Sequence, residues 1–445
     1  SVHVDSPPAV PALTTSYVRG TSSAPLVLHT VGEVLQRTVE RFPEREALVF
    51  VEQGVRKTFA QFQQDVDGVA AGLLAIGLTK GDRLCLWGPN SYEWVLMQFA
   101  TAKAGIILVC MNSAYQSQEA DYVLRKVSSS CVNNPVQVGC RLYPSLLLSW
   151  QVECKAVACP TQFKSHKYCD ILRQICPEME ASSPGDIRSS RLPELRSVVV
   201  LDSPQPGTFS LEEVMQAGSS RSRQQLQDLQ RTLTSDDPIN ILFTSGTTGF
   251  PKAATLSHFN IVNNSNLFGR RAEYDWRSVR ICIPVPMFHC FGAVIGGIGM
   301  AVHGTSLVFP SAGYKIKTTL ETLQNERCTD LFGTPTIFVD MVNYQHLDKY
   351  DLSSVYGGEK NTPTGRFSSA IPTGVTRSAP FCSGCSAGVI GGAPCSPELM
   401  KDMIVSTGIK KITVSLDFIN NNVILGIVAK MLVLTEKKMF VSFGF

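Results

Sequence analysis

Short apolar runs alternate with longer stretches of helical spacing over most of the 445 residues. Apolar residues at helical spacing predict helices over residues 31–42 and 58–74, the second with Thr58 as its N-cap, and further helices are predicted over 92–103 and 258–270. Buried strands are predicted at residues 83–87, 106–111, 198–201, 239–243, 281–286, 307–309 and 330–332. Strands that alternate with helices predict an α/β fold built on layered, largely parallel sheets.

The composition narrows the class of protein. Hydrophobic residues make up 44% of the chain and charged residues 17%, as in a globular protein with an ample core. The net charge of 40 − 37 = +3 gives no reason to expect nucleic acid or an anionic membrane as a partner. No run of eighteen apolar residues occurs, so no transmembrane segment is expected. The 14 cysteines lack the spacing of a disulfide framework, which favours a reducing compartment.

The chain divides into three parts by composition. Residues 1–30 are rich in Ser, Thr and Pro, and we expect either a disordered segment or the remnant of a targeting sequence. Residues 31–414 form one large domain in this interpretation. Two stretches, 128–152 and 359–388, interrupt it without a recognisable pattern and are interpreted as insertions. Residues 415–445 form an apolar tail without a motif.

One stretch carries chemistry. It follows the predicted strand at 239–243, precedes the predicted helix at 258–270, and consists of Thr244, Ser245, Gly246, Thr247, Thr248, Gly249, Phe250, Pro251 and Lys252. Ligands of open α/β sheets bind at the carboxyl ends of the strands. The two glycines allow close backbone approach, the hydroxyl groups and backbone N–H groups can surround a polyphosphate, and the lysine adds a positive charge. Phe250 and Pro251 separate the second glycine from the lysine, so this is not a Walker A loop.

This stretch resembles the phosphate-binding signature of the adenylate-forming superfamily, which includes acyl-CoA synthetases, luciferases and peptide-synthetase adenylation domains. One departure is Ala253, where the family usually has glycine. The resemblance covers about residues 30–415 except the two insertions. Within the superfamily, residues 87–92, 104–109 and 257–266 are similar to the mitochondrial medium-chain acyl-CoA synthetases.

Further stretches resemble site segments of the same family. His289, within residues 286–292, corresponds to a side chain of the acyl or thioester site. The resemblance assigns an acyl pocket to Phe288, Gly333, Thr334 and Pro335, and a loop that packs against adenine to Gly391, Gly392, Ala393 and Pro394. It assigns no metal ligand in this chain.

The resemblance implies an ATP-dependent ligase that joins a medium-chain fatty acid to coenzyme A through an acyl-adenylate, with Mg²⁺ accompanying ATP. It implies the large N-terminal domain of such enzymes and a mitochondrial matrix location, with the cytoplasm as the alternative. The family's Tyr-Gly-x-Thr-Glu and Thr-Gly-Asp motifs are not found, nor is the small C-terminal domain with its lysine. We therefore expect the chain as given to be catalytically incomplete.

Two other interpretations remain open. The chain can be a non-catalytic nucleotide- or acyl-binding fragment of the same family. Residues 384–388 match the nucleophile elbow of α/β-hydrolases, with Ser386 as nucleophile, but that pattern needs a preceding strand and a following helix. Cys382 and Cys385 match half of a zinc site, although no second pair lies at suitable spacing.

Overall fold

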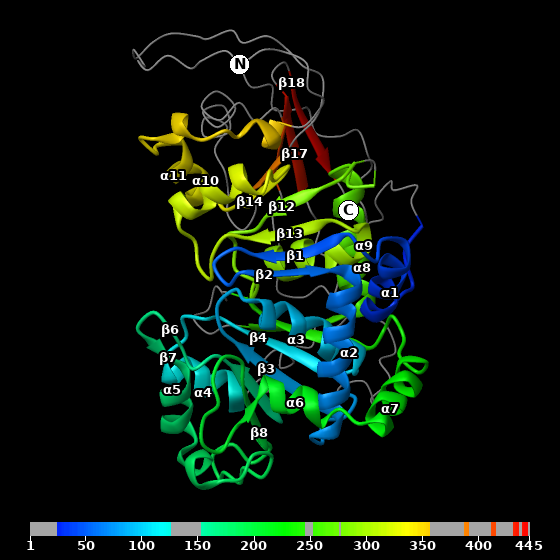
Figure 1. Cartoon of the computed structure of the whole chain (residues 1–445), viewed down its shortest axis with the longest axis vertical. Coiled ribbons are helices and arrows are strands. Elements are labelled where there is room, and N and C mark those ends of the chain that lie inside the picture. The colour runs from blue at the N-terminus through cyan, green and yellow to red at the C-terminus, as the bar shows by residue number, and fades with distance from the viewer. Residues whose placement is uncertain are drawn as a thin grey trace, which may run out of the picture.

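A computed structural model describes residues 25–125, 153–244, 252–275 and 277–356, together with four later strands. Two sheets lie one above the other, with helices between and around them (Figure 1). The predicted α/β class with largely parallel sheets is confirmed.

The larger sheet has nine strands in the order β18-β17-β16-β15-β14-β12-β13-β1-β2. The six strands from β16 to β1 are mutually parallel, whereas β2, β17 and β18 run antiparallel to their neighbours. Its strands are β1 (Glu46–Phe50), β2 (Val55–Thr58), β12 (Arg280–Cys282), β13 (Ser306–Phe309), β14 (Asp330–Gly333), β15 (Ala387–Ile390), β16 (Lys411–Val414), β17 (Lys430–Thr435) and β18 (Lys438–Phe443). The carboxyl ends of the six parallel strands therefore meet along one edge.

The second sheet has seven strands in the order β11-β10-β4-β3-β5-β8-β9. All are parallel except β11, which pairs antiparallel with β10 at the sheet's border. Its strands are β3 (Arg83–Trp87), β4 (Ile107–Met111), β5 (Ala156–Cys159), β8 (Ser197–Val200), β9 (Phe209–Ser210), β10 (Pro238–Thr244) and β11 (Lys252–Ser257). A separate hairpin joins β6 (Gln162–Phe163) to β7 (His166–Lys167).

The helices cover both faces of the sheets. They are α1 (Val31–Arg41), α2 (Phe59–Ala75), α3 (Tyr92–Lys103), α4 (Ser117–Arg125), α5 (Tyr168–Ile175), α6 (Leu211–Ala217), α7 (Ser220–Gln230), α8 (His258–Arg271), α9 (Gly299–His303), α10 (Ile316–Asn325) and α11 (Pro335–Val342). A π-helix, η3 (Phe291–Ile298), precedes α9, and short 3₁₀ turns are η2 (Pro177–Ala181), η4 (Leu347–Lys349) and η5 (Ser353–Tyr356).

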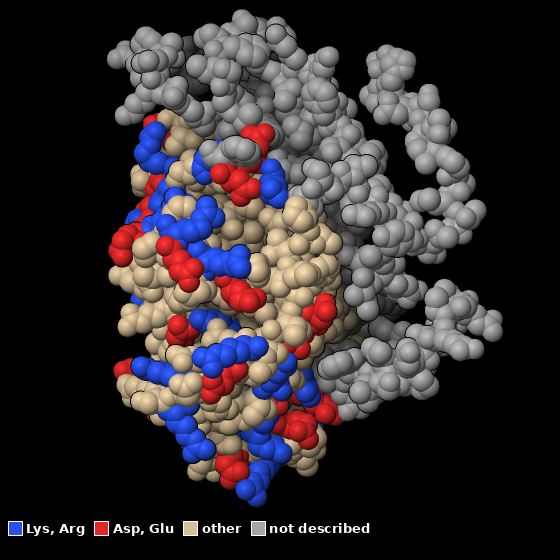
Figure 2. Space-filling view, turned by 90° about the vertical axis from the view of Figure 1, so that its right-hand side faces the viewer, with Lys and Arg blue, Asp and Glu red and all other residues tan. Residues whose placement is uncertain are grey.

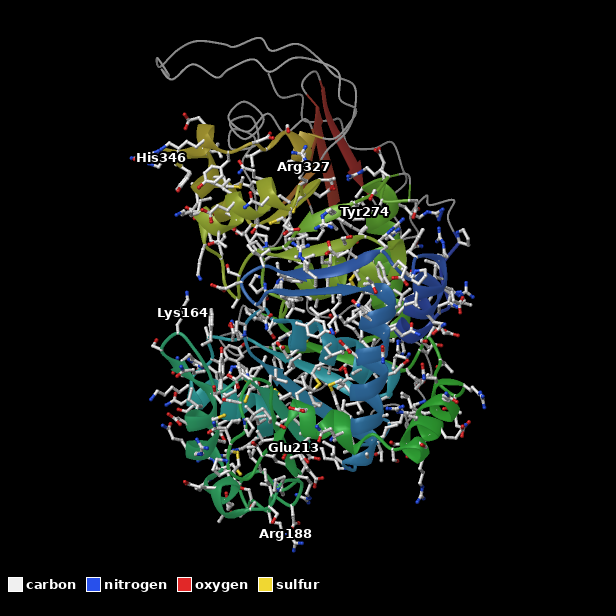
Figure 3. All side chains as sticks on the ribbon, viewed as in Figure 1. Lys164, Arg188, Glu213, Tyr274, Arg327 and His346 are labelled. Atoms are coloured by element: carbon white, nitrogen blue, oxygen red, sulfur yellow. The ribbon has the colours of Figure 1, made fainter. Side chains whose placement is uncertain are left out.

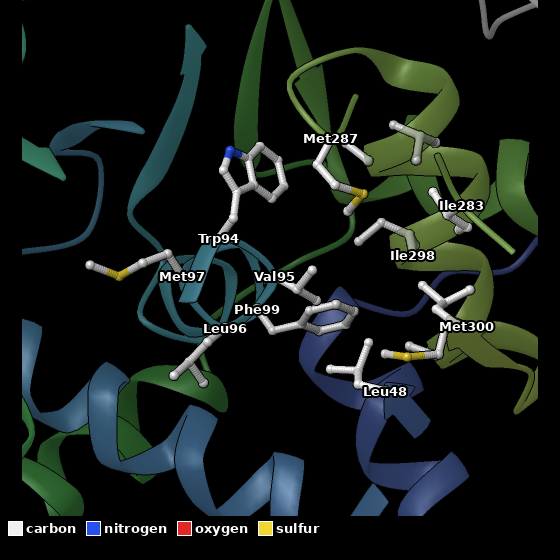
Figure 4. Close-up of a cluster of buried hydrophobic side chains, with 14 of the residues drawn as sticks. Leu48, Trp94, Val95, Leu96, Met97, Phe99, Ile283, Met287, Ile298 and Met300 are labelled. Atoms are coloured by element: carbon white, nitrogen blue, oxygen red, sulfur yellow. The ribbon is translucent and has the colours of Figure 1, made fainter. Parts of the chain in front are cut away.

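Helix α3 lies in the core between the two sheets. Eleven of its twelve residues are buried, as expected for a helix with neighbours on every side. Figure 4 shows Trp94, Val95 and Phe99 of this helix opposite Met287 and Ile298. The one basic residue near its end, Lys103, is only 4% exposed and is paired with Asp67. This helix joins the two sheets into one hydrophobic core.

Local sequence signals set several of these boundaries. The Thr58 side chain accepts from the N–H of Gln61, and the Gln61 side chain accepts from the N–H of Thr58, so the predicted N-cap is confirmed as part of a capping box. Thr30 and Glu33 form the same arrangement at the start of α1.

Other boundaries differ from the sequence prediction. Strand β12 ends at Cys282, short of the predicted residue 286, because Pro284 and Pro286 have no N–H groups to continue a strand ladder. Strand β11 separates the signature loop from α8, so the loop leads into a strand and not directly into a helix. Strand β15 begins at Ala387, inside the predicted insertion, and residues 415–445 contain β17 and β18. The division into domain, insertions and tail otherwise stays a prediction.

The described surface carries both signs of charge. Figure 2 shows Lys and Arg side chains intermingled with Asp and Glu on one face of the molecule. Within the described residues, no helix combines the length and apolar character needed to cross a bilayer. The nine cysteines in this part of the chain are buried free thiols.

Candidate functional site

The signature residues 244–252 connect two antiparallel strands. β10 ends at Thr244, β11 begins at Lys252, and these two residues are paired across the hairpin. The residues between them, Ser245 to Pro251, lie outside the described part of the chain. The predicted position at the carboxyl end of a strand is confirmed, because β10 ends at Thr244. β10 also lies parallel to β4, so the two strands end at the same edge of the sheet. The ladder thus holds both ends of the loop at one edge of the seven-stranded sheet.

The end of β3 lies at the same edge. Trp87, the last residue of β3, pairs with Met111 of β4, and its indole N–H donates to the carbonyl of Asn112 at 3.0 Å. Since β4 separates β3 from β10, the ends of β3 and β10 are two strand spacings apart, about 10 Å. Residues 88–91 then lead into α3, whose N-cap Ser91 accepts from the N–H of Trp94.

Phe288 and His289 follow β12 in the larger sheet, and both side chains are partly buried. The Nδ1 atom of His289 accepts a hydrogen bond from the N–H of Phe291 at 3.2 Å. The ring of His289 is thus held by the backbone that leads into the next helix.

The π-helix η3 begins directly after this segment. Such helices are rare and occur often at functional sites. Gly292 is required there, because a Cβ atom at its position would lie 2.3 Å from the carbonyl oxygen of Pro286. The Phe291 ring stacks on Phe332 at a centroid distance of 5.0 Å, and Phe332 precedes Gly333. The stacking connects the His289 segment to the second predicted part of the acyl pocket.

Gly333, Thr334 and Pro335 stand between β14 and α11. Gly333 ends β14, Thr334 occupies the N-cap position of α11, and Pro335 is its first residue. Because β14 is the parallel neighbour of β12, these residues and Phe288 leave the sheet at the same edge. The structure thus places these two segments, about 45 positions apart in the sequence, at one edge of the larger sheet, and their role as an acyl pocket stays a prediction.

The predicted adenine loop, Gly391 to Pro394, lies outside the described residues. Its approach is defined, because β15 ends at Ile390, which is paired with Gly333 of β14. The backbone therefore enters residues 391–394 at the edge that carries the acyl-pocket segments. The same strand argues against the hydrolase interpretation. A nucleophile elbow follows a strand and precedes a helix, whereas Ala387 and Gly388, directly after Ser386, are the first residues of strand β15.

Sequence reasoning missed two buried polar residues beside these segments. Asn90 bonds to the backbone ahead of Phe288, and His258 begins the helix that follows the signature hairpin. His258 is fully buried, and its Nδ1 accepts from the N–H of Val31 at 3.0 Å. The Pro284 and Pro286 pair is the sequence signal for Asn90, because residues between prolines need hydrogen-bond partners from outside a regular strand. No comparable signal marks His258.

His258 makes the stability of the fold depend on pH. Burial lowers the pKa of this imidazole to about 4, against partial opposition from the charges of Asp237 and Glu33. The unfolded chain has the ordinary histidine pKa of about 6.5, so stability is lost as the pH falls from about 6.5 toward 4. We expect the unfolding free energy of wild type to fall between pH 7.5 and pH 5. In His258→Gln this fall should be smaller by about 2 kcal/mol.

Urea unfolding at both pH values measures this difference. His346→Gln provides the matched control, because His346 is an exposed histidine at the periphery of the molecule (Figure 3). The control should keep the wild-type pH dependence. Equal pH dependence in wild type and His258→Gln would contradict the assignment.

Comparison with known proteins places this arrangement in a family. A family model described as AMP-binding enzyme matches residues 35–414. The chain is 53% identical over 415 residues to the medium-chain acyl-CoA ligase ACSF2, mitochondrial, of Danio rerio, covering 93% of this chain and 59% of that protein. It is 44% identical over 404 residues to the Homo sapiens protein of the same name, covering 90% of this chain and 57% of that protein. The chain thus spans less than two thirds of the length of these relatives.

A solved structure shares the fold. The N-terminal domain of FACL13 from Mycobacterium tuberculosis superposes with a TM-score of 0.61 at 20% identity, covering 88% of this chain and 76% of that one. At this identity the likeness concerns the fold alone. It confirms the predicted architecture, since the matched chain is itself an N-terminal domain.

Proposed function

Because the chain belongs to the AMP-binding enzyme family, we propose that it acts as an ATP-dependent ligase. This ligase activates medium-chain fatty acids as acyl-adenylates and transfers the acyl group to coenzyme A. One observation supports the proposal: β3 and β10 end at the same edge of the smaller sheet, and Asn90, just beyond β3, bonds to residues 285 and 287, directly ahead of the predicted acyl segment of the other sheet. ATP phosphates and a carboxylate can meet between these two edges.

The proposed reaction has two steps. A carboxylate oxygen of the fatty acid attacks the α-phosphorus of ATP, the bond to the β-phosphate oxygen breaks, and pyrophosphate leaves. The sulfur of coenzyme A then attacks the acyl carbon, gives up its proton, and displaces AMP. Negative charge develops on phosphate oxygens in the first step, and the hydroxyl groups of Thr244, Ser245, Thr247 and Thr248 with the charge of Lys252 would stabilise it.

The remaining assignments follow from the same site. Phe288, Gly333, Thr334 and Pro335 would border the acyl chain, and Gly391, Gly392, Ala393 and Pro394 would pack against adenine. His289 would contact the acyl group or the thioester. Mg²⁺ would accompany ATP. The names of the two relatives support the medium chain length and a mitochondrial location.

Acyl-dependent ATP–pyrophosphate exchange on the purified chain tests the first step. If the chain performs adenylation, we expect exchange that depends on octanoate, with less exchange on acetate because a short acid buries little apolar surface. Binding of MgATP and octanoate without exchange would instead support the non-catalytic binding fragment. A chain that binds neither ligand would refute both functions.

A further inference from the structure

Asn90 connects the two sheets at the candidate site. It lies three residues beyond the end of β3 and is 5% exposed. Its side-chain Nδ2 donates to the carbonyl oxygen of Val285 at 2.9 Å, and its Oδ1 accepts from the N–H of Met287 at 2.8 Å. Its own N–H donates to the carbonyl of Ala312, just beyond β13, at 3.2 Å. One residue of the smaller sheet thus holds two loops of the larger sheet.

The two prolines explain why a side chain takes this position. Pro284 and Pro286 have no N–H groups and end β12, which leaves the carbonyl of Val285 and the N–H of Met287 without a strand partner. The planar amide of Asn90 supplies one donor and one acceptor, as a neighbouring peptide group would. Buried backbone groups without a hydrogen-bond partner would destabilise the folded chain.

The segment held in this way carries the acyl site. Met287 is fully buried and lies beside Trp94 and Ile298 (Figure 4), and Phe288 and His289 come directly after it. Asn90 itself extends from β3, which shares an edge with the signature hairpin. Asn90 therefore links the segment ahead of Phe288 to the sheet edge at which β3 and β10 end.

We propose that Asn90 is a positioning residue that holds the Phe288–His289 segment in register with the ATP-binding edge of the other sheet. The inference rests on the proposed function. Adenylation requires the carboxylate and the α-phosphate at near-contact distance, and a displacement of about 1 Å can cost about 10²-fold in such a reaction. Asn90 acts through the backbone of residues 285–287, and no contact of its own with substrate is required.

Two ligands separate this role from general damage. MgATP probes the nucleotide edge alone, and a sulfamate analogue of octanoyl-adenylate spans both edges. We expect Asn90→Ala to weaken binding of the analogue by about 10- to 100-fold and binding of MgATP by less than about 3-fold. Isothermal titration calorimetry on the purified chain measures both.

Asn263→Ala is the matched control. Asn263 is also 5% exposed, and it makes the same kind of paired contact, accepting from the N–H of Val27 at 2.7 Å and donating to its carbonyl at 2.8 Å. It clamps the segment ahead of α1, which carries no site residue. We expect a comparable loss of stability and less than about 3-fold change for either ligand.

Asn90→Asp provides a second test of the proposal, which can be used if the alanine variant does not fold. An ionised carboxylate can still accept from Met287 but repels the carbonyl of Val285, whereas a protonated carboxyl group can donate to it. Burial favours the protonated form. Binding of the analogue by Asn90→Asp should therefore strengthen as the pH falls and the carboxyl group is protonated, unlike that of wild type.

Four results would decide against the inference. Wild-type affinity of Asn90→Ala for the analogue, or equal losses for both ligands, would overturn it and leave the proposed function standing. A wild-type-like pH profile in Asn90→Asp would also overturn it. A wild-type chain that binds neither ligand would refute the proposed function and this inference with it.

Discussion

Lys252→Ala should weaken the binding of MgATP by about 10- to 100-fold. A charged hydrogen bond contributes about 1.5–3 kcal/mol, and this is the only lysine or arginine of the signature stretch. The backbone at Lys252 is fixed by its pairing with Thr244, so the variant should keep the hairpin and lose only the charge. Titration of a fluorescent ATP analogue, with competition by MgATP, measures the effect.

Arg188→Ala is the control for the loss of one positive charge. Its side chain is 80% exposed and lies at the lower end of the molecule in Figure 3, where it pairs with Asp186. The ATP affinity of this variant should remain within about 2-fold of wild type, because exposed charges at a distance are screened by salt. Equal affinities in the two variants would argue against a phosphate contact by Lys252.

The sequence predicted those elements whose signals are local. Strand β3 and helix α3 have the predicted bounds, and β3 is a short run of mostly buried apolar residues, which is a property of neighbouring positions. Thr58 was identifiable as an N-cap for the same reason. The signature stretch was placed at a strand end because four of the five residues from Ile239 to Phe243 are apolar, the exception being Asn240.

The features that escaped prediction depend on contacts between distant residues. Strand β1 is held by β13, some 260 positions later, and nothing within Glu46–Phe50 distinguishes it from other apolar runs. The segment after β12 is held by Asn90, which precedes it by about 190 positions. His258 is buried against Val31, 227 positions away. Register and burial of this kind are set by tertiary packing, which single-sequence patterns do not contain.

Asp330→Asn should lower the free energy of unfolding by about 3–5 kcal/mol. Asp330 begins β14 with its side chain fully buried, and both carboxylate oxygens accept from the Arg277 guanidinium at 2.7 Å. Thr329 donates a further hydrogen bond at 2.6 Å. An amide would keep the shape but leave the charge of Arg277 without a partner in a largely buried position. Urea unfolding at pH 7.5 measures the loss.

A second substitution separates the charge from the shape. If the unpaired guanidinium causes the loss, then Arg277→Met in the Asp330→Asn background should recover about 1–3 kcal/mol, since an apolar side chain can replace one member of a buried pair. Asp186→Asn removes a carboxylate from the exposed pair with Arg188, at 61% and 80% exposure, and should change stability by less than about 1 kcal/mol. The contrast between the two pairs tests burial itself. If Asp330→Asn and Asp186→Asn lost the same free energy of unfolding, desolvation at Asp330 would not be the cause of the loss. The Asp330–Arg277 pair would then contribute no more than a surface contact to holding β14, the strand that ends at Gly333.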